Sequence, residues 1–249
     1  MGGSTVVNDD FYVGYETGIP AVARPRVRGA VATALATSLI VGLTVVVSQS
    51  PLPAARFDSG AETAFSGVVR LDPEPALDTD SGRILLVAPG KRGAASLVRD
   101  FVNRRVALKG ALIERGGLRL LEVVPAAITA ASGAAAGGAA GSLTDVGDVV
   151  LTGEIVDAKC YAGVMNPGEG TVHRDCARAC LRGGLPAMFA VRTPDGRDVL
   201  FALESTDGAA LGEAVADVAG RQITLAGRAF TALHGRRILR IDPRALEPH

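Results

Sequence analysis

The chain lacks tryptophan, and its 249 residues include only three cysteines and three histidines. Basic and acidic side chains are equal in number, and aromatic residues make up 4% of the sequence. A neutral chain with few aromatic side chains has little of the positive charge and stacking surface that bind nucleic acid, so no nucleic-acid partner is expected. Phosphate-binding loops, H-E-x-x-H helices and a Ser-His-Asp arrangement are absent as well, and we assign no catalytic residues and no enzyme class.

Charge is also missing from a long stretch near the N-terminus. Residues 29–50 contain no charged side chain and are long and apolar enough to cross the hydrocarbon core of a bilayer. Three arginines stand just before them, so the positive-inside rule puts residues 1–28 in the cytoplasm as a short head. We therefore predict a signal anchor in a bacterial inner membrane, with the soluble domains in the periplasm. The alternatives are a buried helix and a cleaved signal peptide, and the sequence leaves cleavage open.

Low-complexity sequence divides the soluble part in two. Residues 126–147 consist largely of Ala and Gly in their first part, which is typical of a flexible linker, and they separate two similar segments, 56–125 and 148–249. Each segment has three short strands with alternating apolar residues, then a helix, then two strands. This is the order of an OB-fold barrel. We predict a mainly β protein in which two small OB-like barrels follow one transmembrane helix; two open α+β sheets are the alternative.

Matching glycines align the two segments and locate an insertion. Gly67 corresponds to Gly153, an offset of 86 residues, and Gly110 corresponds to Gly227, an offset of 117. The second segment therefore carries about 31 extra residues, and we place the insertion at residues 158–186. Because the first barrel closes without such a segment, we expect the insertion to protrude from the second barrel and to have a function of its own.

All three cysteines lie in this insertion. Cys160 ends the preceding strand, and His173, Cys176 and Cys180 follow at a spacing that puts them on one face of a helix. Thiolates and imidazoles are ligands that zinc and copper accept in a tetrahedral site. We predict a zinc or copper centre formed by these four residues, with Met165 as an additional ligand if the ion is Cu(I).

The same cysteines also suit a disulfide. In an oxidising periplasm Cys160 would pair with Cys176 or Cys180 and staple the insertion to its strand, leaving one thiol free. A bond between Cys176 and Cys180, one helical turn apart, would be reducible and would favour redox exchange. The sequence does not decide between metal and disulfide. It contains no C-x-x-C-H for covalent haem, and the missing twin-arginine signal argues against an exported iron–sulfur cluster.

The motif D-x-x-C-Y-x-G-V-M-x-P-G-x-G-x-x-H-R-x-C-A-x-x-C at residues 157–180 resembles that of a group of uncharacterised bacterial membrane-anchored proteins. The stretch D-D-F-Y-V-G-Y at residues 9–15 is similar to theirs. The second segment also resembles small exported OB-like domains in which a cysteine ends the first strand and a C-x3-C helix follows. These resemblances imply the architecture and the choice of site, and they imply no activity.

Together these features predict a membrane-anchored periplasmic accessory subunit whose insertion binds a metal or docks a redox partner. Its partner would be a membrane or periplasmic protein, and the three aromatic residues in 9–15 would either dock that partner or anchor a disordered tail. A thiol–disulfide or copper-handling redox protein is the first alternative. A structural adaptor with a staple disulfide is the second.

Overall fold

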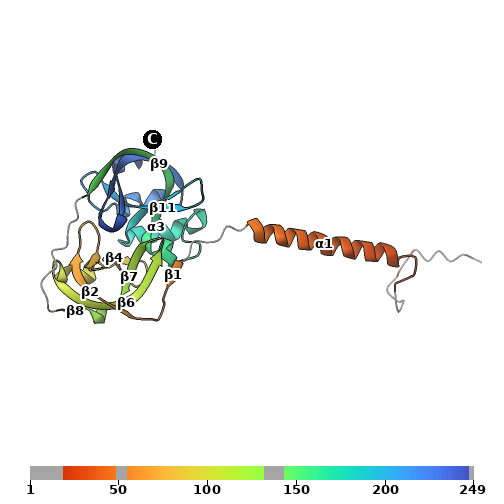
Figure 1. The fold of residues 1–249 in the computed structure, drawn as a ribbon, viewed down its shortest axis with the longest axis horizontal. Coiled ribbons are helices and arrows are strands. Elements are labelled where there is room, and N and C mark those ends of the chain that lie inside the picture. The colour runs from red at the N-terminus through yellow and green to blue at the C-terminus, as the bar shows by residue number, and fades with distance from the viewer. Residues whose placement is uncertain (1–18, 49–54, 132–142, 247–249) are drawn as a thin grey trace, which may run out of the picture. The chain divides into compact units, whose positions relative to one another are not determined.

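The structure is a computed structural model that describes residues 19–48, 55–131 and 143–246. The chain divides into two compact units, Met1–Leu52 and Pro53–His249 (Figure 1). The aromatic stretch 9–15 and half of the expected linker lie outside the described residues.

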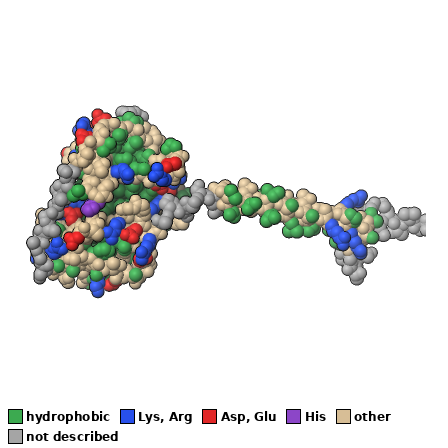
Figure 2. All heavy atoms as spheres, viewed as in Figure 1, with side chains coloured by type: hydrophobic (Ala, Val, Ile, Leu, Met, Phe, Trp, Pro, Cys, Tyr) green, Lys and Arg blue, Asp and Glu red, His purple; other side chains and the backbone are tan. Residues whose placement is uncertain are grey.

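The described part of the first unit is dominated by one helix, α1 (Arg24–Ser48). Its most apolar 18-residue window has a mean hydropathy of 2.3, and none of its side chains is buried. Hydrophobic side chains cover its length, and basic side chains gather at one end (Figure 2). The hydroxyls of Thr44 and Ser48 donate hydrogen bonds to the carbonyls of Ile40 and Val45, which satisfies both groups inside the helix. By length and composition, α1 can serve as a membrane anchor or a signal sequence.

The first barrel is a closed ring of five strands. They are β2 (Thr63–Arg70), β3 (Ala76–Thr79), β4 (Gly82–Ala88), β6 (Arg105–Arg115) and β7 (Leu118–Val123). β4 pairs with β7 in parallel, and the other neighbours around the ring are antiparallel. The short helices α2 (Ala95–Val98) and η1 (Arg99–Phe101) link β4 to β6. Three short strands extend the sheet: β1 (Ala55–Phe57), β5 (Arg92–Gly93) and β8 (Thr129–Ala130).

The second barrel repeats this arrangement. Its strands are β9 (Thr144–Asp157), β10 (Ala187–Arg192), β11 (Asp198–Ser205), β12 (Gln222–Thr231) and β13 (Arg237–Ile241). They close in the order β10-β11-β13-β12-β9, and β11 pairs with β13 in parallel. A 3-10 helix, η5 (Gly212–Val218), lies between β11 and β12. Three strands, a helix and two strands, with the third and fifth strands parallel, form an OB-like barrel, so the fold prediction is confirmed and the open-sheet alternative is wrong.

The glycines that align the two segments occupy equivalent places in the two barrels. A Cβ on Gly67 or Gly153 would lie 2.4 Å from a backbone oxygen of the next strand, at Asp78 and Ala190 respectively. Such contacts are too close for any other residue, so these glycines allow the first two strands of each barrel to approach tightly. Because Asp78 and Ala190 are 112 positions apart and the glycines 86, 26 extra residues lie between the first two strands of the second barrel.

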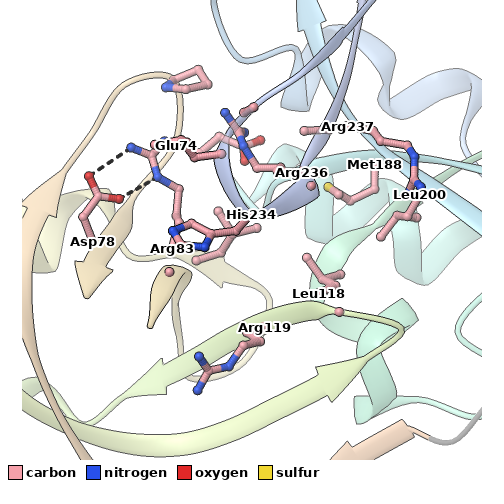
Figure 3. A pocket seen from close by; sticks show the side chains of 18 of the residues that line it. Glu74, Asp78, Arg83, Leu118, Arg119, Met188, Leu200, His234, Arg236 and Arg237 are labelled. Carbon is pink, nitrogen blue, oxygen red and sulfur yellow. Dashed lines mark hydrogen bonds and ion pairs between the residues drawn. The ribbon is translucent and has the colours of Figure 1, made fainter. Parts of the chain in front are cut away.

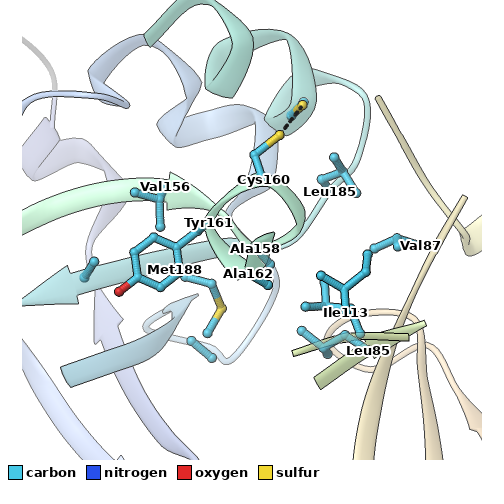
Figure 4. Close-up of a cluster of buried hydrophobic side chains, with 14 of the residues drawn as sticks. Leu85, Val87, Ile113, Val156, Ala158, Cys160, Tyr161, Ala162, Leu185 and Met188 are labelled. Atoms are coloured by element: carbon cyan, nitrogen blue, oxygen red, sulfur yellow. Dashed lines mark hydrogen bonds between the residues drawn. The ribbon is translucent and has the colours of Figure 1, made fainter. Parts of the chain in front are cut away.

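The insertion folds into three short elements: η3 (Cys160–Val164), the 3-10 helix η4 (Thr171–His173) and α3 (Arg174–Arg182). It does not protrude, contrary to the sequence-based prediction. Cys160, Tyr161 and Ala162 are buried, and they pack with Leu85 and other apolar residues of the first barrel and with Met188 and neighbours in the second (Figure 4).

The insertion therefore forms a third hydrophobic core at the junction of the barrels, besides one core inside each barrel. We expected the insertion to protrude because the first barrel closes without such a segment. That reasoning failed because closing each barrel leaves an apolar outer face, and burying both faces on the insertion stabilises all three parts.

Candidate metal centre

Asp157 holds the turn that carries Cys160. β9 ends at Asp157, and the Oδ1 atom of this residue accepts a hydrogen bond of 2.8 Å from the backbone N–H of Cys160. A carboxylate that accepts from the amide three residues later is the usual way to start a helical turn. Both side chains are buried, so Cys160 is held in a fixed position under the insertion.

Helix α3 supplies the other two thiols. Its inner face buries Ala177, Cys180 and Leu181, while Cys176 is half-buried one turn earlier. On the outer face Arg178 and Arg182 each place an Nη2 atom 2.7 Å from Asp217, a residue of η5. These exposed pairs contribute little stability. They tether α3 to the second barrel on the side opposite Cys180.

The three sulfur atoms converge. All lie within 4.8 Å of one another, and the Sγ atoms of Cys160 and Cys180 are 3.9 Å apart. Bonds of about 2.3 Å from a central ion to tetrahedral thiolates put neighbouring sulfurs about 3.8 Å apart. The three cysteines are free thiols in this structure, and the distance between the Cys160 and Cys180 sulfurs is the one that a thiolate-bound ion needs.

The thiols differ in acidity. A hydrogen bond from Cys160 lowers the pKa of Cys180, because it stabilises the Cys180 thiolate. The same bond raises the pKa of Cys160, and burial adds to this effect. Burial and the nearby Cys180 thiolate raise the pKa of Cys176. Cys180 therefore ionises first, and an ion that binds all three thiolates must displace the protons of the other two.

The first barrel places a cation beside this centre. Residues 88–93 form a hairpin between β4 and β5, and the backbone N–H of Gly93 donates a 2.9 Å hydrogen bond to the carbonyl of Gly183. The contact requires glycine, because a Cβ on Gly183 would lie 1.9 Å from the carbonyl oxygen of Lys91. The exposed Lys91 carries its ammonium to Cys176, and the Cys176 thiolate raises the pKa of Lys91.

His173 and Met165, the other two predicted ligands, lie outside the group of three cysteines. His173 is buried just before α3, and its Nε2 atom lies 3.2 Å from Oδ2 of Asp157. Asp157, Cys160 and His173 form a second group of ligand atoms within 4.8 Å, which shares only Cys160 with the first. Met165 follows the Cys160 turn, and its side chain is 46% exposed. The structure thus brings the three cysteines together and pairs the histidine with a carboxylate.

Two residues near the centre were missed from the sequence. Asp157 carried a usable signal, an acidic residue three positions before a cysteine at a strand end, which is where a cap belongs. Lys91 carried none, because its position depends on how the first barrel docks against the insertion.

A carboxylate that orients a buried imidazole is a common outer support of metal sites, which suits the arrangement of Asp157 and His173.

Comparisons with known proteins add no relative to this description. No family model, no curated protein and no solved structure matches the chain. The geometry of the three thiols is therefore the basis for the functional argument.

Proposed function

We propose that the chain is a membrane-anchored accessory subunit that presents a thiolate metal centre of Cys160, Cys176 and Cys180 at the junction of two periplasmic OB-like barrels. The observation that carries this proposal is the convergence of three free thiols from two separate elements, with 3.9 Å between the Cys160 and Cys180 sulfurs. Three sulfur ligands favour a soft ion, so Zn²⁺ or Cu⁺ is the expected metal.

The centre is open on one side. Cys160 and Cys180 are buried, whereas Cys176 is half-buried, and Lys91 beside it is exposed. A fourth ligand, from water or a partner protein, would approach from this side. His173 and Asp157, which are hydrogen-bonded to each other, lie on the Cys160 side of the centre. There they support the Cys160 sulfur and leave the open position free.

Metal analysis of the full chain, purified from membranes under reducing conditions, tests the proposal. We expect about one Zn²⁺ or Cu⁺ per chain, and Cys176→Ser should weaken its binding at least tenfold, because one of three thiolates is removed. Val172→Ser is a matched control in the same insertion, since Val172 is 84% exposed. Reduced chain that binds neither ion, or binds equally well after Cys176→Ser, would show that the proposal is wrong.

Topology needs a separate test. Alkaline phosphatase joined after His249 should be active in cells, and a fluorescent protein that folds only in the cytoplasm should be dark at the same site, because the three arginines at the start of α1 hold the N-terminus inside. The opposite pattern would remove the periplasmic assignment and leave the metal proposal standing.

The pair Cys160 and Cys180 also supports a second candidate, thiol–disulfide exchange with a partner protein. The lowered pKa of Cys180 favours its thiolate, and Cys160 is close enough to form the bond after a small movement. In such a reaction, a disulfide of the partner would accept two electrons and two protons as the two sulfurs join. Metal-free chain that keeps three free thiols in excess oxidised glutathione would contradict this candidate.

A further inference from the structure

A pocket of about 850 Å³ lies between the two barrels, away from the cysteines. The first barrel contributes residues around the turns at 72–83 and 116–119, and the second contributes residues of β11, β13 and the turn at 232–236. The volume is in the range of pockets that hold small organic molecules. The lining combines basic side chains with an apolar wall, and this combination indicates the charge and polarity of the ligand.

Five arginines line the pocket, and Figure 3 labels four of them. Two of the five, Arg119 and Arg240, form ion pairs with Glu114 and Glu204. Arg83 is fully engaged, since its Nε and Nη2 atoms donate to the two oxygens of Asp78 at 2.8 and 3.2 Å. Arg236 has only a long contact, 3.9 Å to Glu204, whose other oxygen accepts a hydrogen bond from Arg240. Arg237 has no ion pair or side-chain hydrogen bond within the part of the chain that the structure describes. Arg236 and Arg237 are therefore the cations with capacity for a ligand.

The carboxylates around the pocket do not cancel this charge. Burial raises the pKa of Glu74 to about 8, so this side chain is largely protonated at neutral pH. Asp198 accepts from Arg115 and from the hydroxyl of Tyr161. Within the described residues, the other pocket acids without an arginine partner are Asp72, Asp80 and Asp207, and all three are exposed to solvent, where salt screens them.

The opposite wall is apolar. Figure 3 shows Leu118 from the first barrel and Met188 and Leu200 from the second facing the same space as Arg237. Met188 is buried. A ligand that reaches the arginines therefore also covers apolar surface, which favours an organic body over a bare inorganic ion.

His234 completes the basic side. It lies in the turn Leu233–Gly235 with a φ of 59°, a conformation uncommon for a residue other than glycine, and its side chain is exposed. Its ring packs 3.7 Å from the position of a Cβ on Gly82, across the junction of the barrels. Residues held in such conformations cluster at ligand sites. The turn thus aims an imidazole into the pocket next to Arg236.

We propose that this pocket binds a small organic anion, a carboxylate or phosphate with an apolar body, which is attracted by the positive charge of Arg236 and Arg237 and by the imidazole of His234. The apolar body lies against Leu118, Met188 and Leu200. The site is independent of the thiolate centre, and nothing in it requires a metal.

Calorimetric titration of the full chain in neutral phosphatidylcholine nanodiscs tests this assignment, with empty nanodiscs as the blank. The probes are naphthylacetate and naphthyl phosphate, which share a body and differ in the anionic group, and naphthylmethylamine, which carries the opposite charge. We expect saturable binding of at least one anion and at least tenfold weaker binding of the amine, because only an anion can pair with the arginines. The better of the two anions identifies the head group.

Two variants locate the site. Arg237→Gln should weaken the preferred anion at least tenfold without unfolding the chain, since Arg237 is exposed. His234→Gly suits the backbone conformation, so weaker binding after this change reports the lost imidazole and not a misfolded turn. Arg228→Gln, outside this pocket, is the control. Equal binding of the amine and the anions, unchanged affinity in both variants, or no saturable binding would each overturn the proposal.

Discussion

The buried Lys159, at the start of the insertion, forms an ion pair with the half-buried Glu122 of the first barrel, next to the cysteine that begins the metal centre. Its Nζ atom also donates hydrogen bonds of 2.9 and 2.8 Å to the carbonyl oxygens of Ala88 and Gly90, at the base of the hairpin that carries Lys91. One ammonium group thus satisfies three acceptors of the first barrel, and it ties that barrel to the Cys160 turn.

Lys159→Ala should lower the free energy of unfolding by about 2–3 kcal/mol, because it leaves the buried carbonyl of Ala88 and the half-buried carboxylate of Glu122 without their donor. Lys109→Ala is the control, since Lys109 is exposed on β6 and its loss should change stability by less than about 0.5 kcal/mol. Thermal and denaturant unfolding of the full chain would measure both. Equal stability of the two variants would mean that Lys159 does not hold the barrels together.

His173→Gln should retain the metal but weaken its binding by about 10–100-fold, since we place the imidazole in a supporting role beside Cys160. Asp157→Asn should have a comparable effect, because it weakens the same support. Competition with a chelator of known affinity measures the change. Complete loss of metal in His173→Gln, or a loss of affinity larger than that in Cys176→Ser, would instead make the histidine a ligand.

Metal affinity should rise with pH between about pH 6 and 8. The pKa values of Cys160 and Cys176 are raised, so both thiols are protonated across this range and must each release a proton when the ion binds. The apparent affinity should therefore increase at least 100-fold per pH unit, corresponding to the release of at least two protons. Calorimetry in buffers of different ionisation enthalpy counts these protons directly. Release of fewer than two would contradict the three-thiolate centre.

Glu74 predicts a separate pH dependence of stability. Its pKa is raised to about 8 in the folded chain, so between its ordinary pKa and pH 8 the folded state binds more protons than the unfolded state. Stability should therefore fall as the pH rises through this window and level off above it. Glu74→Gln should remove this fall and stabilise the chain at pH 8 on the order of 2 kcal/mol. Unfolding curves of both proteins at several pH values provide the comparison.

Much of the barrel architecture could be predicted from sequence because it is local and repeated. Alternating apolar residues mark the strands, and the glycine pairs, such as Gly67 with Gly153, recur where strands must approach closely. The cysteine grouping was predictable for the same reason: Cys176 and Cys180 are one helical turn apart, and Cys160 follows a strand that leads into the same insertion.

The contacts that join the barrels could not be predicted in this way. Lys91 reaches the cysteines only because the first barrel docks on the insertion, and no periodic pattern encodes that docking. His173 was placed on the face of a helix that in fact begins one residue later, so a local boundary decided its partner. Boundaries of this kind are the least certain part of any reading of a sequence.

Two similar barrels on one chain amount to a dimer whose subunits are permanently joined. In a dimer of identical chains, any loop that gains cysteines appears twice, and both copies must fit at the symmetry axis. Here only β9 leads into such a loop, and the other barrel presents its unmodified face to receive it. Duplication within one chain therefore allows one barrel to carry the thiols and the other to serve as the wall of their site. The expected stoichiometry is one ion for every pair of barrels.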